Sequence, residues 1–280
     1  MSVGKEIKIK LIALDLDGTT LRSKSVLSEE TKDTLEAAIK KGVHVVVATG
    51  RTFTALPEQI FDIDGLEYII TSNGAYITRL KDKKVIYENY LEPEGAVRMH
   101  SLLSRFRQFP IEVFTQGRAY IDRQVFDDVK KNGSDYMDAA YIVRTRTPVE
   151  NVYDLLLNKK EKIENINIHF RDFRDKEVMK ELLEKEKDIT VTSSMPHNLE
   201  IGGKTTSKAQ AVAALCRILK IEEEDVMAAG DSPNDGAMIK AAGLGVAMGN
   251  AVDEIKEMAD FVTLTNEEDG VAFAVRKFVL

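Results

Sequence analysis

Residues 11–21 read LIALDLDGTTL, an apolar run that two aspartates, Asp15 and Asp17, interrupt before a glycine and two threonines. A strand that ends after Asp15 can turn so that Asp17 approaches the same point from the loop. The carboxyl ends of strands are where open α/β sheets hold ligands. Two close carboxylates repel unless a cation or a shared proton offsets them. The stretch therefore predicts a buried strand that ends in an acidic site, with an acidic structural turn as the alternative.

The size and charge of the chain narrow the class of protein. Its 280 residues suit two domains, or one domain with a large insertion. There are 46 acidic and 39 basic residues, for a net charge of -7, and no broad basic stripe, so we expect no nucleic-acid partner. Neither residues 1–10 nor any later window reaches the ~18 apolar residues of a membrane span. We therefore expect a cytoplasmic protein without membrane contact, either a monomer or a weak homodimer.

Strands and helices alternate at both ends of the chain. Near the start, Ser28 can cap a helix that ends at Gly42. Strands are predicted at 43–48 and 68–71, and a hairpin from 75–78 and 84–90. Near the end, Ser207 can cap a helix to residue 220, and the single cysteine, Cys216, lies on its apolar side as a core residue. Further strands are predicted at 226–229, 244–248 and 261–264, and helices from GDSPND to Gly243, at 252–258 and at 270–278.

The middle of the chain has a different order of predicted helices and strands. Helices are predicted at 93–109 and 176–186, with strands that include 111–115 and 163–170. This order suits helices on one face of an antiparallel sheet. The sequence therefore predicts an α/β fold in which residues 1–91 and 195–280 form a parallel-sheet core, and residues 92–194 form an inserted α+β domain.

Polar side chains follow four strands of the predicted core. They are Asp15 and Asp17, then Thr49, Gly50 and Arg51, then Ser72 and Asn73, and finally Asp231, Asn234 and Asp235. Parallel strands would gather all of them at one edge of the sheet. Carboxylate, backbone and water oxygens suit Mg²⁺. The histidines, at 44, 100, 169 and 197, have no metal-binding spacing and are interpreted as structural.

Several of these residues have a second interpretation. In GDSPND, Ser232 and Pro233 are good residues for the start of a helix, so capping alone could explain the motif. Thr49 and Gly50 could end a strand, or offer a hydroxyl and backbone N–H groups to an anion such as phosphate. Lys208 lies at a helix start, where the dipole disfavours a cation, and a surface lysine is the alternative to a phosphate ligand.

Taken together, the motifs resemble those of the haloacid dehalogenase superfamily of phosphatases. They are DLDGT at 15–19, ATGR at 48–51, SNGA at 72–75, SK at 207–208 and GDSPND at 230–235. The chain is more narrowly similar to the Cof-like branch of sugar-phosphate phosphatases, which carry a large α/β cap inserted after the third core strand. AMGNA at 247–251 and NEEDGVA at 266–272 fit that branch too. Thr20 and Ala209 depart from it, where leucine and glycine are usual.

This resemblance implies roles for individual residues. Asp15 would attack phosphorus, and Asp17 would act as general acid and then as general base. Mg²⁺ would be held by Asp15, the Asp17 carbonyl, Asp231 and Asp235. The phosphoryl group would be bound by Thr49, Gly50, Lys208 and Asn234, while Arg51 and Asn73 could contact substrate or the cap.

The expected function is therefore Mg²⁺-dependent hydrolysis of small phosphate monoesters, with sugar phosphates as the first candidates. A phosphomutase with the same core is the alternative in chemistry. A phospho-acceptor signalling domain is the non-enzymatic alternative. The sequence does not identify cap residues that contact substrate. Arg118, Tyr120 and His197 are only guesses, and an ordinary surface or structural role is the better interpretation of each.

Overall fold

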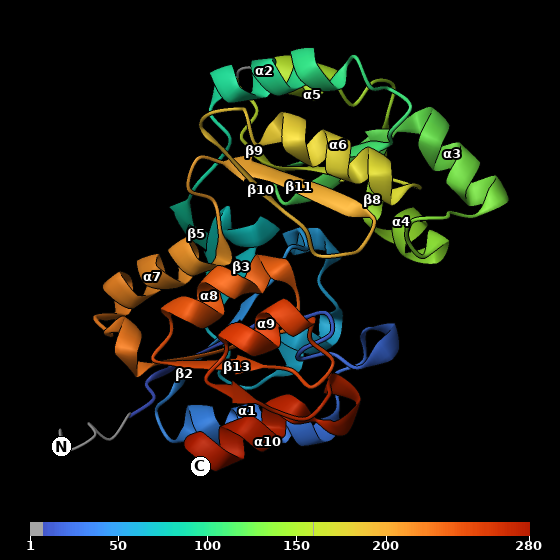
Figure 1. Cartoon of the computed structure of the whole chain (residues 1–280). Helices are drawn as coiled ribbons and strands as arrows, with labels where there is room; N and C mark the ends of the chain where they lie inside the picture. The colour runs from blue at the N-terminus through green and yellow to red at the C-terminus, as the bar shows by residue number, and fades with distance from the viewer. Residues whose placement is uncertain (1–7, 159) are drawn as a thin grey trace.

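The computed structural model describes residues 8–158 and 160–280 in two stacked lobes (Figure 1). The larger lobe is built on an eight-stranded sheet in the order β14-β13-β12-β1-β2-β3-β4-β5. Its strands are β1 (Leu11–Leu14), β2 (His44–Ala48), β3 (Tyr68–Thr71), β4 (Tyr76–Arg79), β5 (Lys84–Glu88), β12 (Val226–Gly230), β13 (Leu244–Ala247) and β14 (Phe261–Val262). All neighbours from β14 to β3 are parallel, and β4 and β5 form an antiparallel extension.

Strand β1 is buried on both faces, which explains its continuous apolar run. Ile12 and Leu14 pack into the core under α1 (Glu29–Lys40) and α10 (Gly270–Phe278). Leu11 and Ala13 face α7 (Lys208–Leu219), where Cys216 is a buried core residue as predicted. Two shorter helices, α8 (Gly236–Ala241) and α9 (Asp253–Met258), contact β13. The α/β fold class expected from the sequence is confirmed.

The second lobe contains a six-stranded sheet in the order β10-β11-β9-β6-β7-β8. Its strands are β6 (Ile111–Thr115), β7 (Arg118–Asp122), β8 (Arg146–Val149), β9 (Ile163–His169), β10 (Ile189–Thr192) and β11 (Asn198–Gly203). One face is covered by α2 (Pro93–Leu103), α5 (Asp154–Leu157) and α6 (Phe173–Leu183). Helices α3 (Arg123–Asn132) and α4 (Ala139–Thr145) lie at the β8 end. The sheet is antiparallel except for the parallel pair β7–β8, which the sequence did not predict.

The chain returns to the larger lobe later than expected. Residue 195 was the predicted boundary, but β11 follows it and pairs with β9 and β10 in the smaller sheet. The reason is that Leu199 and Ile201 complete the apolar face under the helices. Helix ends also differ: α2 ends at Leu103 instead of residue 109, and α6 runs over Phe173–Leu183 instead of 176–186.

The other face of the smaller sheet is polar and points toward the larger lobe. In β9, Ile166 and Ile168 point to the helices, so Asn165, Asn167 and His169 point the opposite way. Glu200 in β11 follows the same alternation and bonds Asn73 in the larger lobe. A buried polar sheet face therefore closes over the carboxyl ends of the core strands.

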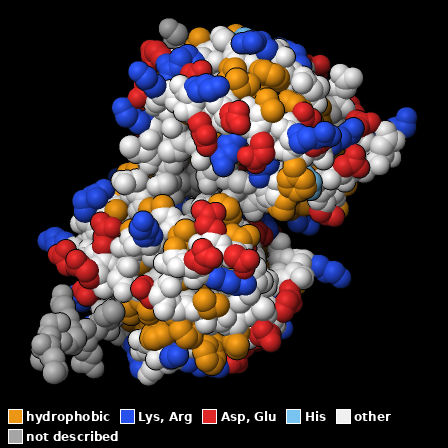
Figure 2. All heavy atoms as spheres, in the orientation of Figure 1, with side chains coloured by type: hydrophobic (Ala, Val, Ile, Leu, Met, Phe, Trp, Pro, Cys, Tyr) orange, Lys and Arg blue, Asp and Glu red, His pale blue; other side chains and the backbone are white. Residues whose placement is uncertain are grey.

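No helix in the described part of the chain is long and apolar enough to span a membrane. Residues 1–7, where the sequence predicts no membrane segment, lie outside the described residues. On the face shown in Figure 2, basic and acidic side chains are interspersed over both lobes.

Candidate active site

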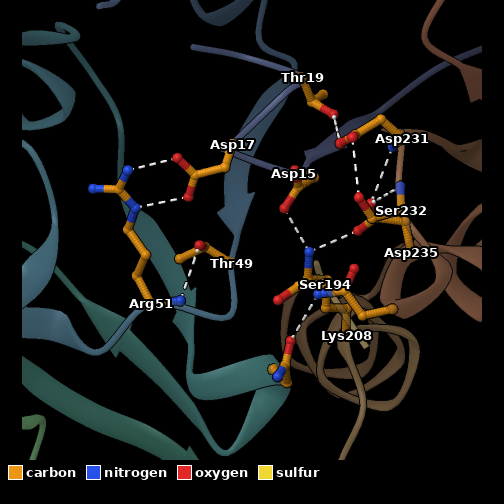
Figure 3. A network of polar contacts seen from close by, with 12 residues as sticks. Asp15, Asp17, Thr19, Thr49, Arg51, Ser194, Lys208, Asp231, Ser232 and Asp235 are labelled. Atoms are coloured by element: carbon orange, nitrogen blue, oxygen red, sulfur yellow. Dashed lines mark hydrogen bonds and ion pairs between the residues drawn. The ribbon is translucent and has the colours of Figure 1, made fainter. Parts of the chain in front are cut away.

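A buried lysine joins two of the predicted acidic groups. Lys208, the first residue of α7, places its Nζ 2.5 Å from Asp15 Oδ1 and 2.6 Å from Asp235 Oδ1 (Figure 3). All three residues are buried. Burial opposes the charge of Lys208, but the two carboxylates outweigh it and raise the pKa of its ammonium. Lys208 is therefore a charged group inside the site and not a surface lysine.

Asp231 and Asp235 lie in the loop that follows β12. Asp235 Oδ2 accepts hydrogen bonds from the N–H groups of Asp231 and Ser232, at 3.1 and 3.0 Å. Asp231 accepts from the hydroxyls of Thr19 and Ser232, both at 3.0 Å. The capping and acidic-site interpretations of GDSPND are thus compatible, because one carboxylate oxygen caps the turn and the other faces Lys208.

Asp15, Asp231 and Asp235 form a compact group of carboxylates. One oxygen from each lies within 4.8 Å of the others. Burial, followed by the nearby Asp235 charge, raises the pKa of Asp15 and raises that of Asp231 to about 6. Three carboxylates against the single Lys208 ammonium leave an excess of two negative charges when all are ionised. Hard oxygen donors with that excess fit a divalent cation such as Mg²⁺.

The Asp17 carboxylate lies apart from this group. It is half-exposed and forms a bidentate pair with Arg51, at 2.5 Å from Nη2 and 2.7 Å from Nε (Figure 3). The same guanidinium lies 5.1 Å from the ring centre of Tyr141 in the smaller lobe. Burial opposes the charge of Arg51, but its bonds to Asp17 raise its pKa. Arg51 therefore links the second aspartate of the motif to the opposite lobe.

The remaining candidates line the same strand edge. Thr49 is buried, and its Oγ1 accepts from the Arg51 N–H at 3.1 Å. Asn234 donates to Asn73 Oδ1 at 3.0 Å, and Asn73 donates to Glu200 at 2.9 Å. A Cβ on residue 50 would lie only 3.1 Å from Asn73 Oδ1, so a side chain at this position would crowd Asn73.

A cavity of about 610 Å³ lies between the two lobes above these groups. The larger lobe contributes Asp15, Asp17, Lys24, Ser25, Thr49, Gly50, Arg51, Thr52, Ser232 and Asn234. The smaller lobe contributes Phe114, Met137, Asp138, Tyr141, Arg144, Arg146, Asn167, Ser194, Met195 and Glu200. The sequence analysis missed the second set. The alternation of apolar and polar residues in INIH and NLEI, at 166–169 and 198–201, was the available signal for Asn167 and Glu200.

The three guessed cap residues do not line this cavity. Arg118 is exposed, and Tyr120 packs with the apolar core beneath the helices of the smaller lobe. His197 contacts the ring of Phe173, with ring centres 4.5 Å apart. The interpretation of the three as ordinary surface or structural residues fits these positions better.

A second buried carboxylate joins the lobes. Glu164 in β9 accepts from Ser72 Oγ at 2.5 Å and from the Gly117 N–H at 2.6 Å. The Gly117 carbonyl in turn accepts from the N–H and hydroxyl of Thr54. Burial raises the pKa of Glu164 to about 7. This contact therefore ties the β6–β7 turn to the larger lobe through a group that can ionise near neutrality.

A three-layered α/β/α core with an acidic strand edge and a buried lysine defines a class of phosphoryl-handling enzymes. A family model of haloacid dehalogenase-like hydrolases matches residues 12–275, and the chain belongs to that family. Its Cof-like branch, expected from the motifs, is also supported, and the chain is a phosphatase that hydrolyses phosphoric monoesters.

Individual relatives match over nearly the whole chain. The 5-amino-6-(5-phospho-D-ribitylamino)uracil phosphatase YcsE of Bacillus subtilis is 34% identical, with 100% of both chains covered. Phosphatase YwpJ of the same organism is 35% identical over 96% of this chain and 99% of its own. A solved haloacid dehalogenase-like hydrolase from B. subtilis has a TM-score of 0.83 at 33% identity, covering 97% and 100% of the chains. The subclass IIB sugar phosphatase BT4131 has a TM-score of 0.81 at 26% identity, covering 96% and 98%.

Glu164→Gln should weaken the pH dependence of stability. The unfolded chain loses the Glu164 proton near pH 4.5 and the folded chain near 7, so the folded state binds more protons between these values. The free energy of unfolding should therefore fall as pH rises through this window, by at most about 3 kcal/mol from this group. Glutamine cannot ionise, so the variant should lose less stability between pH 5 and 8, measured by thermal unfolding. Glu177→Gln, at an exposed position of α6, should behave like the parent; equal slopes for all three proteins would contradict the assignment.

Proposed function

We propose that the chain hydrolyses small phosphate monoesters, with Mg²⁺ and through an aspartyl-phosphate on Asp15. The observation that carries this proposal is the position of Asp15, which lines the cavity and is bonded to the buried ammonium of Lys208. A phosphate dianion repels a carboxylate nucleophile, so positive charge must bring the two together. Lys208 supplies part of that charge at the Asp15 oxygen.

Asp15 attacks phosphorus in this scheme, and the ester oxygen leaves with a proton from Asp17. Asp17 then takes a proton from the water that hydrolyses the aspartyl-phosphate. Lys208, the Thr49 hydroxyl, the Gly50 N–H and the Asn234 amide bind the phosphoryl oxygens. Asp15, Asp231, Asp235 and the Asp17 carbonyl would hold Mg²⁺, which supplies charge neutralisation and orients the phosphate.

Side chains on the smaller lobe's side of the cavity support a proposal for the substrate class. Asn167, Ser194 and Glu200 offer hydrogen-bonding groups suited to hydroxyls, and Phe114 and Tyr141 offer apolar faces. Sugar and polyol phosphates are therefore the first candidates. Polyol phosphates that carry a flat ring, such as the compound in the name of YcsE, are also included.

We also propose that residues 92–203 act as a cap domain that closes over a core made of the rest of the chain. Arg51, Asn73 and Ser72 support this, because each contacts the smaller lobe. The cytoplasmic location and the monomeric or weakly dimeric state stay predictions.

Asp15→Asn should abolish turnover while preserving the fold. The change removes the nucleophile but keeps a side chain of the same shape, so we expect a loss of roughly a thousandfold or more. Phosphate release from hexose phosphates and p-nitrophenyl phosphate measures activity, and the melting temperature measures folding. Activity within tenfold of the parent would exclude Asp15 as nucleophile.

In the parent enzyme, transfer of the phosphoryl group to a second sugar hydroxyl without phosphate release would favour the phosphomutase alternative.

Removing divalent metal should stop the reaction, and Mg²⁺ should restore it. The proposed ligands are hard oxygens, so Mg²⁺ suits them, while Ca²⁺ should restore less activity because its larger, looser shell disturbs the in-line geometry. The measurement is phosphate release after EDTA treatment and dialysis. Full activity in metal-free buffer would refute the metal role.

Arg144→Ala should change the order in which substrates are preferred. Arg144 lines the cavity from α4 and is exposed, and its guanidinium lies 5.8 Å from the ring centre of Tyr141. Loss of a charge-assisted hydrogen bond should lower kcat/KM roughly tenfold for leaving groups that reach it, and little for p-nitrophenyl phosphate. Arg118→Ala, at an exposed site of the same lobe outside the cavity, is the control. An unchanged substrate order for Arg144→Ala would place this specificity elsewhere.

A further inference from the structure

Two asparagines from the carboxyl-terminal quarter hold the loop that carries Asp17. Asn250 donates from Nδ2 to the Gly18 carbonyl at 2.8 Å. Asn266 donates from Nδ2 to the Leu21 carbonyl at 2.9 Å, and its N–H donates to Asn250 Oδ1 at 2.9 Å. Asn250 and Asn266, here called the asparagine clasp, thus bond both ends of residues 18–21 and each other.

The clasp acts on a loop that is already tightly folded around Asp15. Thr20, at a position where leucine is usual in the branch, donates to the Asp15 carbonyl at 2.5 Å. Gly18 has φ +77°, and a Cβ there would lie 2.7 Å from Asp231 Oδ2. These contacts fix the loop on the side of the carboxylate group. The clasp in addition fixes the Gly18 and Leu21 carbonyls.

We propose that Asn250 and Asn266 are positioning residues that set where the Asp17 carboxylate stands. Within the described chain, the hydrogen bonds of that carboxylate are to Arg51, whose side chain is itself shared with Tyr141 of the other lobe. The position of the Asp17 carboxylate must therefore also depend on the backbone of the loop that carries it. The proposal rests on the proposed function, in which Asp17 protonates the leaving oxygen.

The location of the clasp argues against a role in binding substrate or in core packing. Neither asparagine lines the cavity. Asn250 is exposed and Asn266 is half-buried, on the loops that follow β13 and β14. Their replacement should therefore leave the fold and the substrate contacts in place, and should act on the loop alone.

A comparison of leaving groups tests the proposal. An alkyl phosphate needs a proton on its departing oxygen, whereas p-nitrophenolate departs readily as an anion. General acid catalysis contributes on the order of 10² to 10⁴ in rate, and a small misplacement forfeits part of it. Asn250→Ala should therefore lower kcat/KM for a hexose phosphate roughly tenfold or more, and change it less than about threefold for p-nitrophenyl phosphate.

Further variants separate the bonds of the clasp. Asn250→Asp keeps an acceptor for the Asn266 N–H but cannot donate to Gly18, so it should resemble Asn250→Ala. Asn266→Asp keeps its backbone bond to Asn250 but cannot donate to Leu21, and should show the same selective loss. Asn132→Ala is the matched control, because Asn132 is exposed on α3 and bonds only its neighbour Asp128 in the described structure. It should match the parent on both substrates.

Asp17→Asn separates the acid role of Asp17 from the positioning role of Asn250 and Asn266. It should lower kcat/KM, which reports the steps up to formation of the aspartyl-phosphate, far more for the hexose phosphate than for p-nitrophenyl phosphate, whereas loss of the general base slows the later hydrolysis of the intermediate for both. If it does, and the asparagine variants lose activity equally on both substrates or not at all, the positioning role is overturned and the proposed function stands. If Asp17→Asn lowers kcat/KM equally for both substrates, the role of Asp17 as acid fails and the positioning role fails with it.

Discussion

The ion pairs of Lys208 with Asp15 and Asp235 are the interaction on which the core depends. A buried ammonium costs several kcal/mol unless it is paired, and a helix start adds an unfavourable dipole. The two partners come from the ends of β1 and β12, so these strands must be neighbours, and α7 must begin directly above them. Gly74 permits that approach, since a Cβ there would lie 2.2 Å from the Ser207 carbonyl oxygen.

The cluster of Asp15, Lys208 and Asp235 also suggests different roles for the two lobes. In the proposed mechanism its charges and backbone groups would bind the phosphoryl group whatever alcohol is attached, because they lie on the larger lobe's side of the cavity. In the proposed mechanism the leaving group would lie toward the polar face of the smaller sheet, from which Asn167 and Glu200 line the cavity. That face is buried, and the Glu200–Asn73 and Glu164–Ser72 hydrogen bonds satisfy two of its carboxylates across the interface.

Local pattern was enough to predict much of the core. The bounds of β3 and α10 were predicted to the residue, and Ser28 and Ser207 cap α1 and α7 as expected. The smaller lobe was predicted less well because its boundary depends on β11 pairing with β9, about thirty residues away in the chain. Asn167, Glu200 and Glu164 resemble surface residues in the sequence, and only the packing of one lobe on the other buries them. The motifs located Asp15 and Lys208, but no spacing shows that Asp17 pairs with Arg51.

The position of Asp17 depends on parts of the chain that share no motif with it. Strand β1 ends before Asp17, so the strand alone leaves the loop free to turn. Contacts from Asp231, Asn250 and Asn266, all more than 200 residues later, restrict it. They can do so because β12, β13 and β14 lie successively beside β1 in the sheet and bring their loops to the same edge. The outer strands, which contribute no group to the cavity, therefore still shape the site through the loops that follow them.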